Sequence, residues 1–212
     1  MPIKCRRILI CYLTVLASVP LIEDRLALSQ GMVLYRGVKT NEFMKRWLIL
    51  GPVTIPRAKG EDPDEEVQKK VFETDFLSSC GGERSAVVGP EKTCSIFGKP
   101  YSWRLLRSEQ DAVDLIKEWG INDFAIAYAW AEIEVRNSTK VVLGVGSDNA
   151  VRVWLNGKLV HENWVMRDVE SDEDLVKLDL HTGKNQVLLK VLNGQGDWGS
   201  YRSLSCTHSN EP

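Results

Sequence analysis

The segment Val151–Gly157 constrains the fold more strongly than any other part of the chain. Apolar residues alternate in it with Arg152 and Trp154, and side chains two residues apart share one face of a β-strand. Asn156-Gly157 follows directly, and this dipeptide favours a type I′ turn because both central residues adopt positive φ. The segment therefore predicts a β-hairpin that returns through residues 158–161.

The same alternation recurs along the C-terminal half of the chain. Residues 124–135 place Ala125 and every second residue after it on one face, and larger side chains such as Tyr128 and Trp130 on the other. Short segments of this kind, separated by turn residues, are typical of a β-sandwich or barrel. Further strands are predicted at residues 140–145, 175–180, 186–192 and 200–205. We therefore expect an all-β, antiparallel fold.

The N-terminal half is predicted to add a few elements to the same domain. The apolar run Trp47–Leu50, which Gly51-Pro52 stops, predicts a buried strand that completes one of the sheets. Residues 103–106 predict another strand. Short helices are expected at residues 63–72, where Pro63 suits a first helical turn, and at residues 111–118.

The first 29 residues resemble a secretory signal peptide. Lys4, Arg6 and Arg7 precede an apolar run that ends at Val19, and this run is short for a membrane span. Small residues before Gln30 predict a cleavage site there. An uncleaved membrane anchor and a misassigned start codon are the alternatives. Export would place the mature chain in the periplasm, on the cell surface or in the medium.

We therefore divide the chain into four parts: a signal peptide (1–29), an N-terminal linker (30–42), one binding domain (43–206) and a flexible tail (207–212). The composition, 43% hydrophobic and 26% charged, is that of an ordinary globular protein. The formal net charge is −2, and no basic stripe follows the N-terminus, so a nucleic-acid partner is not expected. We expect a monomer that does not insert into a membrane after cleavage.

Three cysteines remain after the predicted cleavage: Cys80, Cys94 and Cys206. In an oxidising compartment a Cys80–Cys94 disulfide is expected, because it would close a short loop in an otherwise irregular stretch. Three unpaired cysteines are the alternative. The histidines are too scattered to predict a zinc site.

Residues 146–158, GSDNAVRVWLNGK, resemble the "GSDDGVKVWLNGK" core of galactose-binding-like jelly rolls. This family includes the sugar-binding domain of family 2 glycoside hydrolases and related modules of exported bacterial proteins. Gly81–Glu83, Ala127–Ala129 and Trp198-Gly199 also match, and the resemblance spans about residues 43–204. It departs at Asn149-Ala150, where the family has Asp-Gly. It implies a jelly-roll sandwich with a binding or accessory role, but it does not fix a ligand.

Aromatic and polar residues near the hairpin are the candidate ligand-binding set. An indole stacks on a sugar ring, and loop aromatics beside a guanidinium are typical of recognition sites. The candidates are Asp148, Arg152, Trp154, Trp164, Arg167 and Trp198. The alternatives are that loops bury both faces of the Trp154 strand and that Trp198 packs against a tight turn. The tryptophans at 47, 103, 119 and 130 are predicted to lie in the core.

The acidic stretch 168–174 is the candidate metal site. Asp172 and Asp174 could bind a structural Ca²⁺, which prefers oxygen ligands and is common in jelly-roll modules. The spacing is not that of an EF-hand, and a solvated charged loop is the alternative. No other cofactor is expected.

No pattern in the sequence predicts catalysis. Glu132 and Glu134 share a strand face, too close together to flank a glycosidic bond, and no nucleophile elbow or phosphate-binding loop is present. We therefore expect an exported, non-catalytic module that binds a polysaccharide or glycan. The alternatives are a structural or protein-interaction module, an accessory domain of a glycosidase, and an enzyme whose residues assemble from separate loops.

Overall fold

The computed structural model describes residues 9–15, 32–38, 42–57, 61–86, 88–90, 92–109, 113–147, 149–165 and 174–194. The strands in this part of the chain are β1 Leu9–Val15, β2 Leu34–Arg36, β3 Glu42–Phe43, β4 Arg46–Thr54, β5 Thr93–Ile96, β6 Lys99–Ser102, β7 Arg104–Arg107, β8 Ala125–Val135, β9 Thr139–Ser147, β10 Val151–Leu155, β11 Lys158–Asn163, β12 Asp174–Leu180 and β13 Gly183–Asn193. The helices are α1 Glu65–Glu73, the 3₁₀ turn η1 Ser78–Cys80, and α2 Leu115–Trp119.

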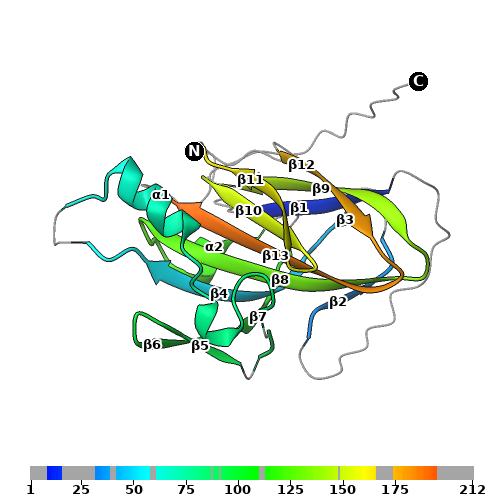
Figure 1. The fold of residues 1–212 in the computed structure, drawn as a ribbon, viewed down its shortest axis with the longest axis horizontal. Helices are drawn as coiled ribbons and strands as arrows, with labels where there is room; N and C mark the ends of the chain where they lie inside the picture. The colour runs from blue at the N-terminus through cyan, green and yellow to red at the C-terminus, as the bar shows by residue number, and fades with distance from the viewer. Residues whose placement is uncertain are drawn as a thin grey trace.

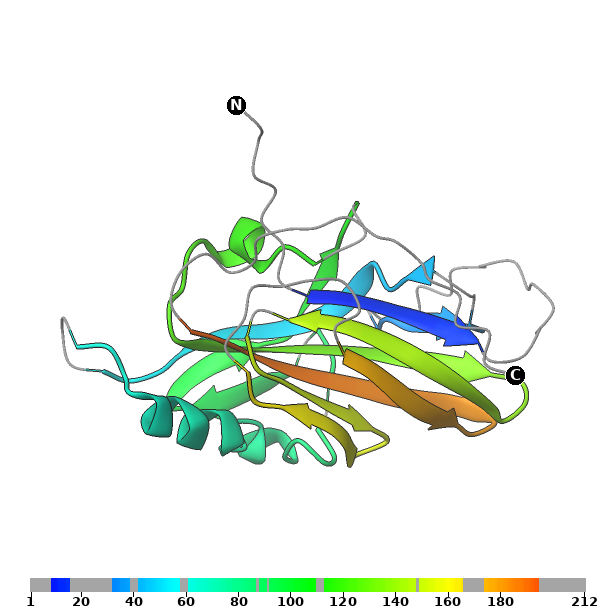
Figure 2. The same ribbon diagram turned by 90° about the horizontal axis from the view of Figure 1, so that it is seen from above.

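The strands form an all-β fold with two main sheets, as the alternation predicted. The larger sheet has the order β11-β10-β13-β8-β4-β7, with β2 paired parallel to β8. The smaller sheet has the order β12-β9-β1-β3, and its neighbouring strands run antiparallel to one another. Figure 2 shows α1 on the opposite side of β13 and β8 from β1 and β9. The finer jelly-roll assignment stays a prediction.

The pairing of β8 with β13 forms the centre of the larger sheet (Figure 1). The two strands run in register from Gly183 opposite Val135 to Asn193 opposite Ala125. Because side chains alternate, the alanines of β8 occupy one face, and Tyr128 and Trp130 occupy the other. Both faces are buried, since Ala127 and Trp130 are each 3% exposed.

A segment that precedes β5 covers the outer face of the larger sheet. This cap segment (residues 61–86) contains α1, η1 and the turn after η1. Its first helix begins at Glu65, where Asp64 is the N-cap and accepts a hydrogen bond from the Val67 amide. Phe72 at the end of the helix is buried. The helix predicted at 63–72 therefore forms at Glu65–Glu73, and Pro63 lies just before its N-cap instead of in its first turn.

Two N-terminal segments lie in the sheets although the sequence did not predict strands there. Leu9–Val15, inside the predicted signal peptide, forms β1 and pairs with β9 from Leu9 opposite Ser147 to Val15 opposite Val141. Leu34–Arg36, inside the predicted linker, forms β2. The signal-peptide prediction concerns processing and stays a prediction. In the intact chain, this segment fills the position between β9 and β3.

Among the described helices, none has the length and apolar character needed to cross a bilayer. The predicted strand at 200–205 and the predicted tail lie outside the described residues.

Candidate functional site

A groove with a volume of about 520 Å³ lies at the tip of the β10–β11 hairpin. We call it the hairpin groove. Its polar lining comes from the hairpin turn, the end of the cap segment and the chain entering β13, and Trp130 of β8 also lines it. The lining residues are Arg84, Ser85, Trp130, Asn156, His181, Lys184 and Gln186, with Met32, Ala86 and Val88 as the apolar members.

The Asn156-Gly157 turn fixes one wall of the groove. Asn156 and Gly157 have φ values of 50° and 77°, as expected for this turn. Asn156 Oδ1 accepts a hydrogen bond from the Gln186 amide at 2.8 Å, and its Nδ2 donates to Asn185 Oδ1 at 3.0 Å. The turn is therefore anchored to β13 on the side of the groove.

The cap segment packs directly against this turn. A Cβ atom added at Gly157 would lie 1.9 Å from the carbonyl oxygen of Arg84. Only glycine permits such a close approach of two backbones. The contact places Arg84 at the rim of the groove.

The titratable side chains that line the groove are basic. They are Arg84, His181 and Lys184. Lys184 Nζ donates to Glu132 Oε2 at 3.0 Å, while the lysine side chain stays 55% exposed. His181 Nδ1 lies 2.9 Å from the carbonyl oxygen of Thr182. The groove thus combines amide side chains with positive charge.

A second polar cluster lies beneath the cap segment. Lys190 of β13 is fully buried, and its Nζ lies 2.8 Å from Glu83 Oε1 and also donates to the carbonyl oxygen of Thr74. Tyr128 donates its hydroxyl to the same Glu83 oxygen at 2.6 Å. The Lys190 ammonium also lies 5.3 Å from the ring centroid of Phe76.

Burial controls the protonation equilibria of this cluster. It raises the pKa of Glu83 against the opposing effect of Lys190, and it lowers the pKa of Lys190 against the opposing effect of Glu83. The pKa of Tyr128 is raised by burial and by the charge of Glu83. Because all three side chains are enclosed, they act as a latch between the cap segment and the sheet, not as a ligand site.

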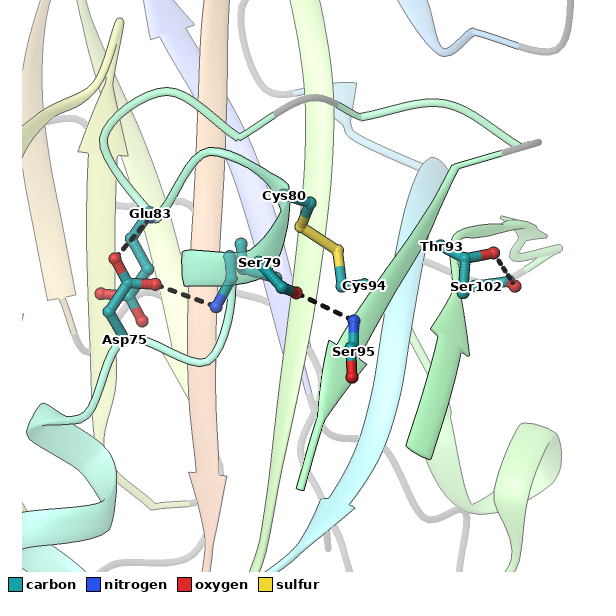
Figure 3. Close-up of a disulfide and its surroundings, with 9 residues drawn as sticks. Asp75, Ser79, Cys80, Glu83, Thr93, Cys94, Ser95 and Ser102 are labelled. Carbon is teal, nitrogen blue, oxygen red and sulfur yellow. Dashed lines mark hydrogen bonds between the residues drawn. A yellow bond between two sulfur atoms is a disulfide. The ribbon is translucent and has the colours of Figure 1, made fainter. Parts of the chain in front are cut away.

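The predicted disulfide is present and fastens the same segment (Figure 3). Cys80 of η1 is bonded to Cys94 of β5, with their Cα atoms 5.4 Å apart. Beside it, Ser79 Oγ accepts a hydrogen bond from the Ser95 amide at 2.9 Å. The disulfide therefore joins the cap segment to the β5–β6 hairpin.

The turn after η1 is shaped by one carboxylate. Asp75 accepts hydrogen bonds from the amides of Leu77 at 2.9 Å and Glu83 at 3.0 Å. Gly81 and Gly82 both have positive φ, and a Cβ at Gly82 would lie 2.8 Å from Asp75 Oδ2. The Gly-Gly-Glu sequence thus brings Glu83 inward to Lys190 and leaves Arg84 at the groove.

Two of the predicted ligand-binding residues are covered. Trp154 is 4% exposed, so its indole offers no face to a sugar, and the prediction for it is corrected in favour of the buried alternative. Arg152 pairs with Glu162, lies 5.0 Å from the Phe72 ring centroid and donates to the Phe72 and Glu73 carbonyl oxygens. It holds the end of α1 on the sheet.

Trp164 is partly buried and also belongs to the interface with α1. Its ring centroid is 5.5 Å from that of Phe72, and its Nε1 donates to Glu65 Oε1 at 3.1 Å. The core prediction is confirmed for Trp47, Trp103 and Trp130, while Trp119 is partly buried. Asp148, Arg167 and Trp198 lie outside the described residues.

The predicted calcium ligands are only partly described. Asp172 lies outside the described residues. Asp174 is 6% exposed; its Oδ1 accepts a hydrogen bond from Asn163 Nδ2 at 2.8 Å and lies 3.2 Å from His161 Nε2. Within the described ranges, no group of three acidic, histidine or cysteine side chains is placed to hold a metal ion.

No family model, curated protein or solved structure matches this chain. The galactose-binding-like assignment therefore remains a prediction that rests on the sequence resemblance.

Proposed function

We propose that the chain is a non-catalytic module that binds a carbohydrate in the hairpin groove. The observation that carries the proposal is the lining of this hollow, where two amide side chains, a serine hydroxyl and basic groups meet. Pockets for small ligands have volumes of roughly 300–1,000 Å³ and a few convergent polar groups. A groove of about 520 Å³ falls within this range.

The chemistry of the lining suits a sugar. Sugar hydroxyls both donate and accept hydrogen bonds, and amide side chains such as Gln186 can do the same. Arg84 adds donors at the exposed rim, and the partly exposed Met32, Ala86 and Val88 contribute apolar surface. The side chain of Asn156 is hydrogen-bonded to β13, so its position at the edge of the groove is fixed.

The site sits on a rigid support, which is a general requirement for recognition by loops. The Gly157–Arg84 contact, the Lys190–Glu83 latch and the Cys80–Cys94 disulfide all hold the cap segment against the sheet. The groove is therefore formed before a ligand arrives. A preformed site loses less conformational entropy on binding.

The binding experiment uses glycan arrays and affinity gels with the full chain. We expect at least one polysaccharide to be retained, and we expect Arg84→Ala to weaken its binding by about 10–100-fold, the loss for a hydrogen bond to a charged group. Arg107→Ala is the matched control, because Arg107 is an exposed arginine on β7, at the opposite edge of the larger sheet. No retention of any polysaccharide would contradict the proposal.

The second candidate function is a structural or protein-interaction module without a small ligand. Burial of Trp154 and the packing of Trp164 on α1 favour it, because aromatic side chains that stabilise the fold are not available for stacking. It predicts equal behaviour of Arg84→Ala and the parent chain on every glycan. An accessory domain of a glycosidase is a special case of the first candidate.

We also propose export. The basic residues and apolar run at the N-terminus support it, and so does the Cys80–Cys94 disulfide, since such bonds persist in oxidising compartments. Mass spectrometry of the protein from its native source tests this. A mature N-terminus near Gln30 is expected, and an intact N-terminus in the cytosol would contradict both export and cleavage.

A further inference from the structure

The hairpin groove differs from a site for neutral sugars in its charge. Its titratable lining consists of Arg84, His181 and Lys184, whereas the chain as a whole has a formal net charge of −2. Resting on the function proposed above, we infer that the ligand of the groove is an acidic saccharide, bound through one carboxylate or sulfate group.

Arg84 differs from several other arginines of the protein because it has no carboxylate partner among the described residues. Arg57, Arg104 and Arg152 each have a carboxylate oxygen within 4.0 Å. For Arg84 the structure records no hydrogen bond or ion pair to any other described residue, and the residue is exposed at the groove. Its main chain is fixed against Gly157, so the guanidinium extends from a stationary point.

A guanidinium in this position matches an anionic group better than a hydroxyl. Its planar donors can form two parallel hydrogen bonds to a carboxylate or sulfate, and charge-assisted bonds are about twice as strong as neutral ones. Outside the groove, Arg57, Arg104 and Arg152 show such pairing with carboxylates. An acidic ligand would supply the partner that the described protein residues do not.

The charge balance limits the ligand to about one acidic group per site. Lys184 is bonded to Glu132, whose side chain is 10% exposed. The two permanent cations, Arg84 and Lys184, less the one carboxylate of Glu132 leave a charge of 2 − 1 = +1. The charge of Lys184 is therefore balanced by Glu132, and Arg84 supplies the uncompensated positive charge.

The experiment compares polymers that share a backbone and differ in charge. Polygalacturonate is paired with its fully methyl-esterified form, and dextran sulfate with dextran, and each is titrated with the full chain by calorimetry. We expect the acidic member of at least one pair to bind at least tenfold more tightly. Preference within the first pair identifies a carboxylate, within the second a sulfate, and within both a site for either group.

Variants separate specific recognition from general attraction. Arg84→Gln should abolish the preference while keeping the hydrogen-bonding capacity of the side chain, and Arg84→Lys should retain part of it. Arg107→Gln on β7 should leave the preference unchanged, and circular dichroism confirms that each variant is folded. Because Arg84 and Arg107 are both exposed, neither change removes buried packing.

The outcomes distinguish this inference from the function on which it rests. Equal binding of acidic and neutral members overturns the inference and leaves carbohydrate binding standing. A preference that survives in Arg84→Gln also overturns it. Failure of every polymer, charged or neutral, overturns the proposed function itself.

Discussion

Two glycines with nearly the same positive φ differ in whether a side chain there would also be crowded. Gly157 has φ +77° and Gly98 has φ +72°, but only at Gly157 would a Cβ meet the main chain, 1.9 Å from the Arg84 oxygen. We expect Gly98→Ala to cost about 1–2 kcal/mol, the price of a left-handed residue. We expect Gly157→Ala to cost about 2–5 kcal/mol, because overpacking is added.

Chemical denaturation of both variants measures this difference. A similar loss of unfolding free energy at the two positions would show that the cap segment shifts away from the hairpin at little free-energy cost. A larger loss at Gly157 together with weaker glycan binding would show that the same contact shapes the groove.

Lys190 gives a second prediction at the level of a residue. Lys190→Met leaves the Glu83 carboxylate buried beside Tyr128 without its cation. Removing one partner of a buried pair costs about 3–5 kcal/mol. Lys140→Met on β9, an exposed lysine, is the control and should change the free energy of unfolding little. Adding Glu83→Gln should recover part of the loss, because Tyr128 can still donate to the amide oxygen.

The loss in Lys190→Met should depend on pH. Burial holds the folded-state pKa of Glu83 above its ordinary value of 4.5, and Lys190 opposes this rise, so removing Lys190 raises the pKa further. A folded-state pKa above the unfolded value stabilises the fold fully below pH 4.5, and this stabilisation disappears as pH rises through the folded-state pKa. Unfolding should therefore show a smaller difference from the parent in mild acid than at neutral pH. A difference that is constant or grows in acid would argue against a buried carboxylate.

Among the elements, the Cys80–Cys94 crosslink should have a measurable effect on stability. The two cysteines are 14 residues apart, and a loop of this size contributes about 3 kcal/mol in the chain-entropy model. We expect Cys80→Ser/Cys94→Ser to lower the free energy of unfolding by about this amount. Reductant should destabilise the parent chain and leave the double variant unchanged. An equal response of both proteins to reductant would contradict a stabilising crosslink.

The sequence predicted the strands well because each depends on a local pattern. The alternation at 124–135, the Asn-Gly turn after Leu155 and the run before Gly51-Pro52 correspond to β8, the β10–β11 hairpin and β4. Gly51-Pro52 does not end β4 as predicted, because the strand continues to Thr54 after a register shift at this dipeptide. β1 escaped prediction because a continuous apolar run suits a signal peptide as well as a buried strand. β2 is only three residues long, too short to show a period.

At the scale of the whole molecule, the site was less predictable than the fold. Period two shows that Arg152 and Trp154 share a face, but it cannot show what covers that face. Arg152 is covered by Phe72 of α1, which lies 80 residues earlier in the chain. Arg84 and Lys184 are also remote from each other in sequence, and they line one groove only because the cap segment folds over the sheet.

The latch beneath the cap segment also sets an order of events during synthesis. Glu83 and Lys190 are 107 residues apart, and Lys190 leaves the ribosome after every other member of the cluster. At a synthesis rate of about 5–20 residues per second, roughly 5–20 s pass between the addition of Glu83 and the addition of Lys190. During that interval the cap segment has no β13 to cover, so the nascent chain exposes Phe72 and Phe76. Chaperones that bind apolar segments can meet these two phenylalanines during this interval.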